Sequence, residues 1–206
     1  MTYAEPIAAT NFSFLRGASH PGEMVETAIA LGHSGIGIAD RNSVAGVVRA
    51  WSALKLAREE GRGFDFKLIT GARLVFADTT PDIIAYPTTR GAWGRLTQLL
   101  SVGNLRAHKG ECILTFADLL EWCEEMALII MPLRKPSNER VLQGLEAKTN
   151  HVWIGATMHR GGRDKRCLAY LQVLSAQTRI PLIATNDALY ATPEARPLHD
   201  ILTCIR

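Results

Sequence analysis

Short apolar, β-branched runs alternate with stretches of helical periodicity along most of this 206-residue chain. The runs predict seven strands, at residues 3–8, 35–39, 67–76, 83–86, 127–131, 151–156 and 181–185. Between them, apolar residues recur at helical spacing, as at Val47, Trp51 and Leu54. Strands that alternate with amphipathic helices favour parallel βα units, so one α/β domain over residues 1–206 is predicted. Two architectures stay open, a barrel-like ring and an open doubly wound sheet.

Local signals place the ends of some of these elements. Thr115 is a predicted N-cap for a short helix that opens with Phe116, and Pro193 is predicted at the first position of a helix. A run rich in Pro, Lys, Ser and Asn marks a break at residues 132–138. The breaks have the composition of turns rather than of long linkers, which supports a single domain.

Composition excludes several classes of protein. Hydrophobic residues make up 47% of the chain and charged residues 21%, which is ordinary for a globular protein and excludes a disordered or fibrous one. The formal net charge of +3 does not by itself require a nucleic-acid partner. Neither a signal-peptide pattern nor an apolar run of the ~20 residues that span a bilayer occurs, so a cytoplasmic protein with no membrane partner is expected. The four cysteines form no CxxC pair and indicate neither a zinc cage nor a redox pair.

Two aspartates come at the ends of predicted strands. Asp40 ends the run GIGIAD, and Asp187 follows the run LIATN. The carboxyl ends of parallel strands meet at one edge, where paired carboxylates hold a divalent metal or act as acid and base. The alternative is that each carboxylate caps the next turn. His159 lies in a segment that is either a strand-end loop or an exposed turn, and the six histidines show neither HxH nor HExxH spacing.

Basic residues cluster most densely at Arg160, Arg163, Lys165 and Arg166. If they converge in space, they are candidate contacts to a phosphate backbone, with affinity that depends on salt. The alternative is an ordinary solvated face, because aromatic residues for base stacking are absent around them.

Three segments resemble one known family. They are residues 3–21, which include NFSFLRGASHP; residues 37–50, GIADRNSVAGVVRA; and residues 183–206, which include IATNDALY and RPLHDILTCIR. Together they resemble the N-terminal polymerase-and-histidinol-phosphatase (PHP) domain of bacterial C-family DNA polymerases, above all the error-prone paralogue of the DNA polymerase III alpha subunit. The resemblance runs over essentially the whole chain. It implies a distorted (β/α)7 barrel with mostly parallel strands.

The resemblance also implies where a metal cluster would lie. Active PHP members hold metal ions that activate water for phosphoester cleavage, through His, Asp, Glu and Cys ligands. Their ligand positions fall here on Ile7, Ala9, Arg16, Asp40, Arg41, Arg73, Leu133, Asp187 and Leu189. The opening His-x-His is thus replaced by two apolar residues, and three ligands are replaced by arginine. Of these positions, only Asp40 and Asp187 carry a carboxylate.

Charge makes metal binding at these positions unfavourable. An arginine stays protonated and offers no lone pair, so Arg16, Arg41 and Arg73 would repel divalent cations. We expect them to form salt bridges with Asp40 and Asp187 in a metal-free pseudo-site without catalytic residues. The alternative is a partly kept site that holds Zn or Mn.

The resemblance therefore implies the N-terminal PHP domain of an error-prone translesion polymerase, in which the nucleotidyltransferase activity belongs to the rest of the chain. A catalytically silent domain with a structural or interaction role is expected, and residues 193–206 would begin the connection to the polymerase body. Two alternatives are a residual metal-dependent phosphoesterase or 3′-5′ proofreading nuclease, and a DNA-binding module acting through the basic cluster. The implied partners are the remainder of the polymerase, DNA through that parent, the sliding clamp and mutagenesis accessory proteins.

Overall fold

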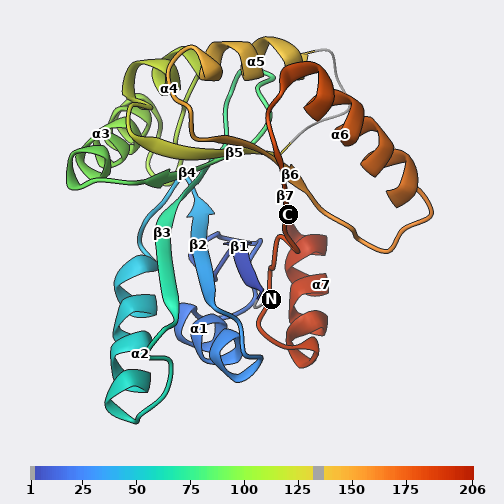
Figure 1. Ribbon diagram of the computed structural model, residues 1–206. Coiled ribbons are helices and arrows are strands. Elements are labelled where there is room, and N and C mark those ends of the chain that lie inside the picture. Colours follow the sequence, from blue (N-terminus) through green and yellow to red (C-terminus); the bar gives the residue numbers. More distant parts are fainter. Residues whose placement is uncertain (1–2, 132–136) are drawn as a thin grey trace. The chain divides into compact units, whose positions relative to one another are not determined.

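The computed structural model describes residues 3–131 and 137–206 (Figure 1). Seven strands follow one another in chain order within one sheet. They are β1 (Ala4–Ala8), β2 (Gly35–Arg41), β3 (Lys67–Leu74), β4 (Ile83–Pro87), β5 (Met126–Ile130), β6 (Val152–Ala156) and β7 (Leu182–Ala184). All seven strands predicted from the sequence are confirmed, with ends that differ by one or two residues. Apolar, β-branched runs of this length were sufficient for β1, β2, β4 and β5 because these strands are mostly buried.

Most of the strand pairs are parallel, as predicted. β1 pairs with β2, β5 with β6 and β6 with β7 in parallel, whereas β4 and β5 pair antiparallel. The antiparallel pair arises because two helices, α3 (Arg90–Arg106) and α4 (Phe116–Trp122), connect these strands. One helix returns the chain to the end where the strand began, and a second helix reverses it again.

The remaining helices follow the predicted alternation, and one of them, α5, was not predicted. They are α1 (Pro21–Ala30), α2 (Val47–Glu59), α5 (Ser137–Glu146), α6 (Asp164–Thr178) and α7 (Arg196–Ile205). The N-cap of α4 is confirmed, since Thr115 and the third residue of the helix form a capping box. Pro193 opens a 3₁₀ turn, Pro193–Ala195, and α7 follows it directly. Of the break predicted at 132–138, residues 132–136 lie outside the described residues, and Ser137 and Asn138 already belong to α5.

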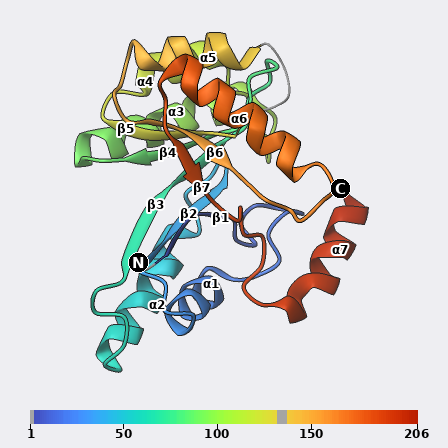
Figure 2. The same ribbon diagram turned by 45° about the vertical axis from the view of Figure 1, so that its right-hand side comes forward.

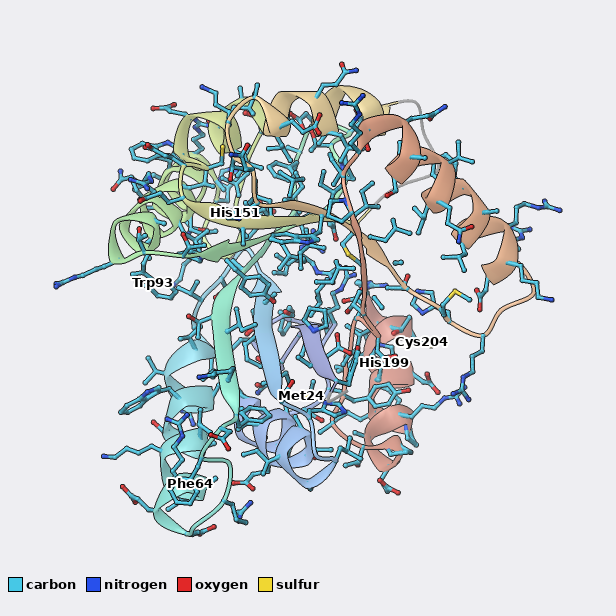
Figure 3. All side chains as sticks on the ribbon, viewed as in Figure 1. Met24, Phe64, Trp93, His151, His199 and Cys204 are labelled. Atoms are coloured by element: carbon cyan, nitrogen blue, oxygen red, sulfur yellow. The ribbon has the colours of Figure 1, made fainter. Side chains whose placement is uncertain are left out.

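Contacts divide the chain into two compact units, each described here by itself. The first consists of Met1–Ala72 with Thr185–Arg206, and the second of Arg73–Ala184. In the first unit, α1 and α2 pack on each other, and buried residues of α1, β2 and α2 form a core that includes Met24, labelled in Figure 3. In the second unit, α4 and α5 lie on the same side of β5 in both ribbon views (Figures 1 and 2).

Within the first unit, β1 also contacts the chain that follows β7. A parallel bridge joins Ala8 to Ala188, with backbone hydrogen bonds from Ala9 to Ala188 (2.9 Å) and from Ala188 to Ile7 (3.0 Å). The buried Glu5 of β1 accepts further hydrogen bonds from residues 185 and 186. The first strand is therefore tied to a segment almost the whole chain away. Among the described residues, no helix combines the length and the apolar character that crossing a bilayer requires.

Candidate functional site

Asp40 is a buried carboxyl group of the first unit with several hydrogen-bond donors around it. It lies near the carboxyl end of β2 and is 1% exposed. Oδ1 accepts hydrogen bonds from the backbone N–H of Thr10 (2.7 Å) and from Ser13 Oγ (2.7 Å), and Oδ2 accepts one from Thr10 Oγ1 (2.9 Å). The carboxylate therefore fixes the loop that follows β1 against the end of β2.

The surroundings of Asp40 leave its carboxylate enclosed. A Cβ atom added to Gly46 would lie 2.5 Å from Oδ2, so the backbone before α2 covers that oxygen closely. Burial raises the pKa of Asp40 above its ordinary value, although the hydrogen bonds from Ser13 and Thr10 act in the opposite direction. The enclosure therefore disfavours the ionised form more than the three hydrogen bonds favour it.

The hydrogen bonds described for Asp40 come from hydroxyl and amide groups, and its pairing with an arginine stays a prediction. Thr10 and Ser13 donate the hydrogen bonds to Asp40, and Arg41, the residue next to it, is exposed. The backbone N–H of Arg41 donates instead to Ser13 Oγ at 2.9 Å. The loop after β1 thus supplies short hydroxyl donors to the buried carboxylate.

The other arginines of the predicted pseudo-site lie in different parts of the chain. Arg16 is half-buried in the loop after β1, in the first unit. Arg73 is 2% exposed and contacts Asp82 within the second unit, with Nη1 and Oδ2 3.2 Å apart. The pairing of Arg16, Arg41 and Arg73 with Asp187 stays a prediction.

The first unit does bring several predicted positions together around β1. Ile7 and Ala9 are buried in and directly after the strand, at 0% and 1% exposure. Asp187 has a left-handed backbone, with φ of 50°, and its N–H donates to Thr185 Oγ1. The carbonyl of Leu189 accepts a hydrogen bond from Ala18 in the loop after β1. Leu133 lies outside the described residues.

Comparison with known proteins identifies the family. The sequence pattern of the PHP domain matches residues 8–179, most of the chain. The chain belongs to the PHP family. It is 50% identical over 208 aligned residues to an error-prone DNA polymerase of Rhodopseudomonas palustris, and 49% identical over 209 to error-prone DNA polymerase 1 of Rhizobium meliloti. Each match covers 99% of this chain but 18% of the relative, so the chain spans less than a fifth of these polymerases.

The fold agrees with this membership. A putative metal-dependent phosphoesterase from Bifidobacterium adolescentis superposes with a TM-score of 0.65, over 93% of this chain and 90% of that one, at 14% sequence identity. The predicted fold class, a distorted (β/α)7 barrel of PHP type with mostly parallel strands, is confirmed by this likeness together with the strand count and order.

The residues present do not fit the metal cluster of an active PHP domain. Such a cluster needs several lone-pair donors, whereas apolar or arginine side chains occupy most of the ligand positions of this PHP domain. Asp40, which matches a ligand position, has both oxygens engaged by Thr10 and Ser13. Within residues 3–131 and 137–206, no group of three or more His, Cys, Asp or Glu side chains is arranged to hold a metal ion.

The predicted DNA-contact cluster lies in the second unit, at the start of α6. Its side chains, Arg160, Arg163, Lys165 and Arg166, are exposed, as is His159. Arg160 has a left-handed backbone with φ of 55°, which is typical of a turn. His159 is thus exposed in the segment that joins β6 to α6, which agrees with both alternatives left open by the sequence.

Three polar residues of the first unit were missed by sequence reasoning: Glu5, Thr10 and Ser13. All three are at most 3% exposed, and each takes part in a hydrogen-bond network. For Glu5 a signal existed, because a carboxylate within the apolar strand AEPIA must find several donors if it is buried. Thr10 and Ser13 gave no such signal, since small hydroxyl residues after a strand are equally common in exposed turns.

Proposed function

We propose that this chain is the N-terminal PHP domain of an error-prone DNA polymerase, and that the domain itself is catalytically silent, holds no metal and has a structural or interaction role. The relatives at about half identity over the full length of this chain support the first part. The remainder of such a polymerase is then the immediate partner. DNA, a sliding clamp and mutagenesis accessory proteins would be partners of the whole polymerase, in the cytoplasm.

The surroundings of Asp40 are the main support for the proposal that the domain is catalytically silent. A carboxylate that serves a metal cluster is joined by other ligands around the same ions, whereas here Ile7 and Ala9 supply only methyl and methylene groups. The donors to Asp40 come from Thr10 and Ser13, so this carboxylate already has a structural role in holding the loop after β1. Loss of one ligand can be compensated, but loss of most of them leaves nothing to bind the ion.

Two measurements on the purified chain test this proposal. Elemental analysis after dialysis is expected to find Zn and Mn far below one ion per chain. A cleavage assay on labelled primer-template DNA, with Mn or Zn added, is expected to give no activity above buffer. A metal-dependent phosphoesterase prepared in parallel is the positive control.

Asp40→Asn separates the silent domain from a residual nuclease. The amide keeps an oxygen for Thr10 N–H and Ser13, and its NH₂ group donates to Thr10 Oγ1, whose hydroxyl accepts equally well. The variant is therefore expected to fold and to leave the metal content and any background cleavage unchanged. Stoichiometric Zn or Mn, together with cleavage that Asp40→Asn abolishes, would contradict the proposal and establish a metal-dependent phosphoesterase.

A further inference from the structure

Two neighbouring segments of the first unit carry positive charge without negative charge. Residues 10–22 and 41–58 contain five Arg and Lys residues and no Asp or Glu. Four of these cations, Arg41, Arg49, Lys55 and Arg58, are exposed, and Arg58 donates to the carbonyls of Gly63 and Phe66. Because the whole chain has a net charge of +3, this concentration is local rather than a general property of the protein.

Exposed aromatic side chains lie in the same two segments. Phe14 is 82% exposed, Trp51 54% and Phe12 36%. Val48, on the same face of α2 as Trp51, is 70% exposed. Large apolar groups at such exposure favour contact with a binding partner when they occur together.

Contacts join the loop after β1 to the end of β2 and to the start of α2. Arg41 N–H donates to Ser13 Oγ, between Phe12 and Phe14, and the Phe12 ring lies 3.4 Å from the place of a Cβ on Gly46, the N-cap of α2. Trp51 follows about one turn after the start of that helix, and Lys55 Nζ lies 5.9 Å from the centre of its ring. We call Phe12, Phe14, Arg41, Arg49, Trp51 and Lys55 the aromatic-basic surface.

We propose that the aromatic-basic surface binds single-stranded DNA. Cations neutralise the phosphates, and exposed aromatic rings stack on bases, a combination that binds single strands with little sequence preference. A duplex offers the phosphates but keeps its base faces stacked inside. The choice of DNA over RNA rests on the proposed polymerase function. The surface differs from the cluster at residues 160–166, which the sequence singled out and which has no aromatic neighbours.

Acidic groups border the surface without covering it. Glu59 lies further along α2 and is 3.8 Å from Lys55 across an exposed ion pair, and Glu60 pairs with Arg62 beyond the end of the helix. Exposed pairs of this kind are weak, so Lys55 is available to a phosphate. Asp40 lies beneath the loop after β1 and is 1% exposed, so its carboxyl group is enclosed rather than part of the surface.

The test measures binding of fluorescent oligo(dT) to the purified chain in EDTA, across a range of salt concentrations. With three cations engaged, the logarithm of the association constant is expected to fall with the logarithm of salt concentration with a slope of about −2. Trp51→Ala is expected to weaken binding about 5- to 150-fold, the range of one lost stacking interaction. Arg49→Ala is expected to reduce the slope by about 0.7.

Two matched controls locate the site. Phe64→Ala removes an aromatic ring that is 68% exposed but follows the far end of α2 (Figure 3), and it is expected to leave affinity unchanged. Arg163→Ala with Arg166→Ala removes charge from the other basic cluster and is also expected to have no effect. All substituted side chains are exposed, so unchanged thermal unfolding midpoints are expected to show that every variant folds.

The proposal is overturned if oligo(dT) does not bind at low salt, if Phe64→Ala weakens binding as much as Trp51→Ala, or if the Arg163 and Arg166 variant alone loses affinity. Tighter binding of oligo(U) or of a duplex also overturns it. EDTA separates this test from that of the silent domain. Metal-dependent cleavage would contradict the proposal that the domain is catalytically silent, but it would not change the binding measured in EDTA. Absence of binding would contradict the binding proposal, but it would not change the metal content or the cleavage result.

Discussion

Replacing Glu5 is expected to destabilise the first unit strongly, because one buried carboxylate there satisfies five donors. Oε1 accepts from Ile7 N–H (3.0 Å) and Thr185 Oγ1 (2.6 Å). Oε2 accepts from Tyr3 OH (2.9 Å), Asn186 N–H (3.1 Å) and Asn186 Nδ2 (2.9 Å). Glu5 itself is 3% exposed. Burial and the negative charge of Glu5 also raise the pKa of Tyr3, so that hydroxyl stays a donor at neutral pH.

The size of the effect depends on which of the five donors can form a hydrogen bond with water after Glu5 is replaced and which stay buried without a partner. In Glu5→Ala, Ile7 N–H and the Thr185 hydroxyl remain buried, at 0% and 5% residue exposure, and each unsatisfied donor costs about 1–3 kcal/mol. Tyr3 and Asn186 are exposed enough to regain water. The free energy of unfolding is therefore expected to fall by about 2–6 kcal/mol, a large share of the ~5–15 kcal/mol of a typical protein.

Urea unfolding followed by circular dichroism measures this loss. A double-mutant cycle sharpens it: Thr185→Val removes one of the stranded donors, so Glu5→Ala with Thr185→Val is expected to be less destabilised than the sum of the single variants. Glu59→Ala, at an exposed glutamate, is the control and is expected to stay within about 0.5 kcal/mol of wild type. A Glu5→Ala protein as stable as this control, or strictly additive single effects, would refute the reasoning.

Three further outcomes are expected in the same unfolding assay. Burial raises the pKa of Asp40 in the folded state. The protonated group therefore contributes to the free energy of unfolding below the unfolded-state pKa, and this contribution is lost as the pH rises through the folded-state pKa. Asp40→Asn should remove this pH-dependent fall in stability. Thr115→Ala removes the N-cap of α4 and should cost about 0.5–2 kcal/mol. Gly17→Ala places a Cβ against the Thr10 carbonyl and should cost about 1–3 kcal/mol, whereas Gly94→Ala, in open space on α3, should stabilise by about 0.5–1 kcal/mol.

The strands could be predicted from the sequence because a buried strand needs apolar side chains, and these form recognisable runs in the sequence. Helix α5 could not, since its first residues, Ser137 and Asn138, have turn composition and its stability depends on packing against neighbouring helices. The antiparallel pairing of β4 with β5 was also missed. It depends on the number of helices between the two strands, and the short α4 has too few residues to show a clear period.

At the site, the position of Asp40 could be predicted from the sequence, but the residues that donate hydrogen bonds to it could not. The run GIGIAD placed Asp40 at a strand end, and the structure agrees. Its partners come from the loop after β1, about thirty residues earlier in the chain, and no periodicity relates the two segments. Thr10 and Ser13 suit this position because a short hydroxyl side chain reaches a buried carboxylate without having to bury a charge of its own.

This difference bears on what an aspartate at a former ligand position means. In an active PHP domain, metal ions neutralise the carboxylates and fix the loops that carry them. Here Thr10 and Ser13 give Asp40 three hydrogen bonds that fix the loop after β1. Asp40 therefore has a structural reason to occupy its position, so its presence is not an argument for catalysis. The same loop, which Asp40 holds through Thr10 and Ser13, presents Phe12 and Phe14 to solvent, and this connects the site proposed to be silent with the proposed binding of single-stranded DNA.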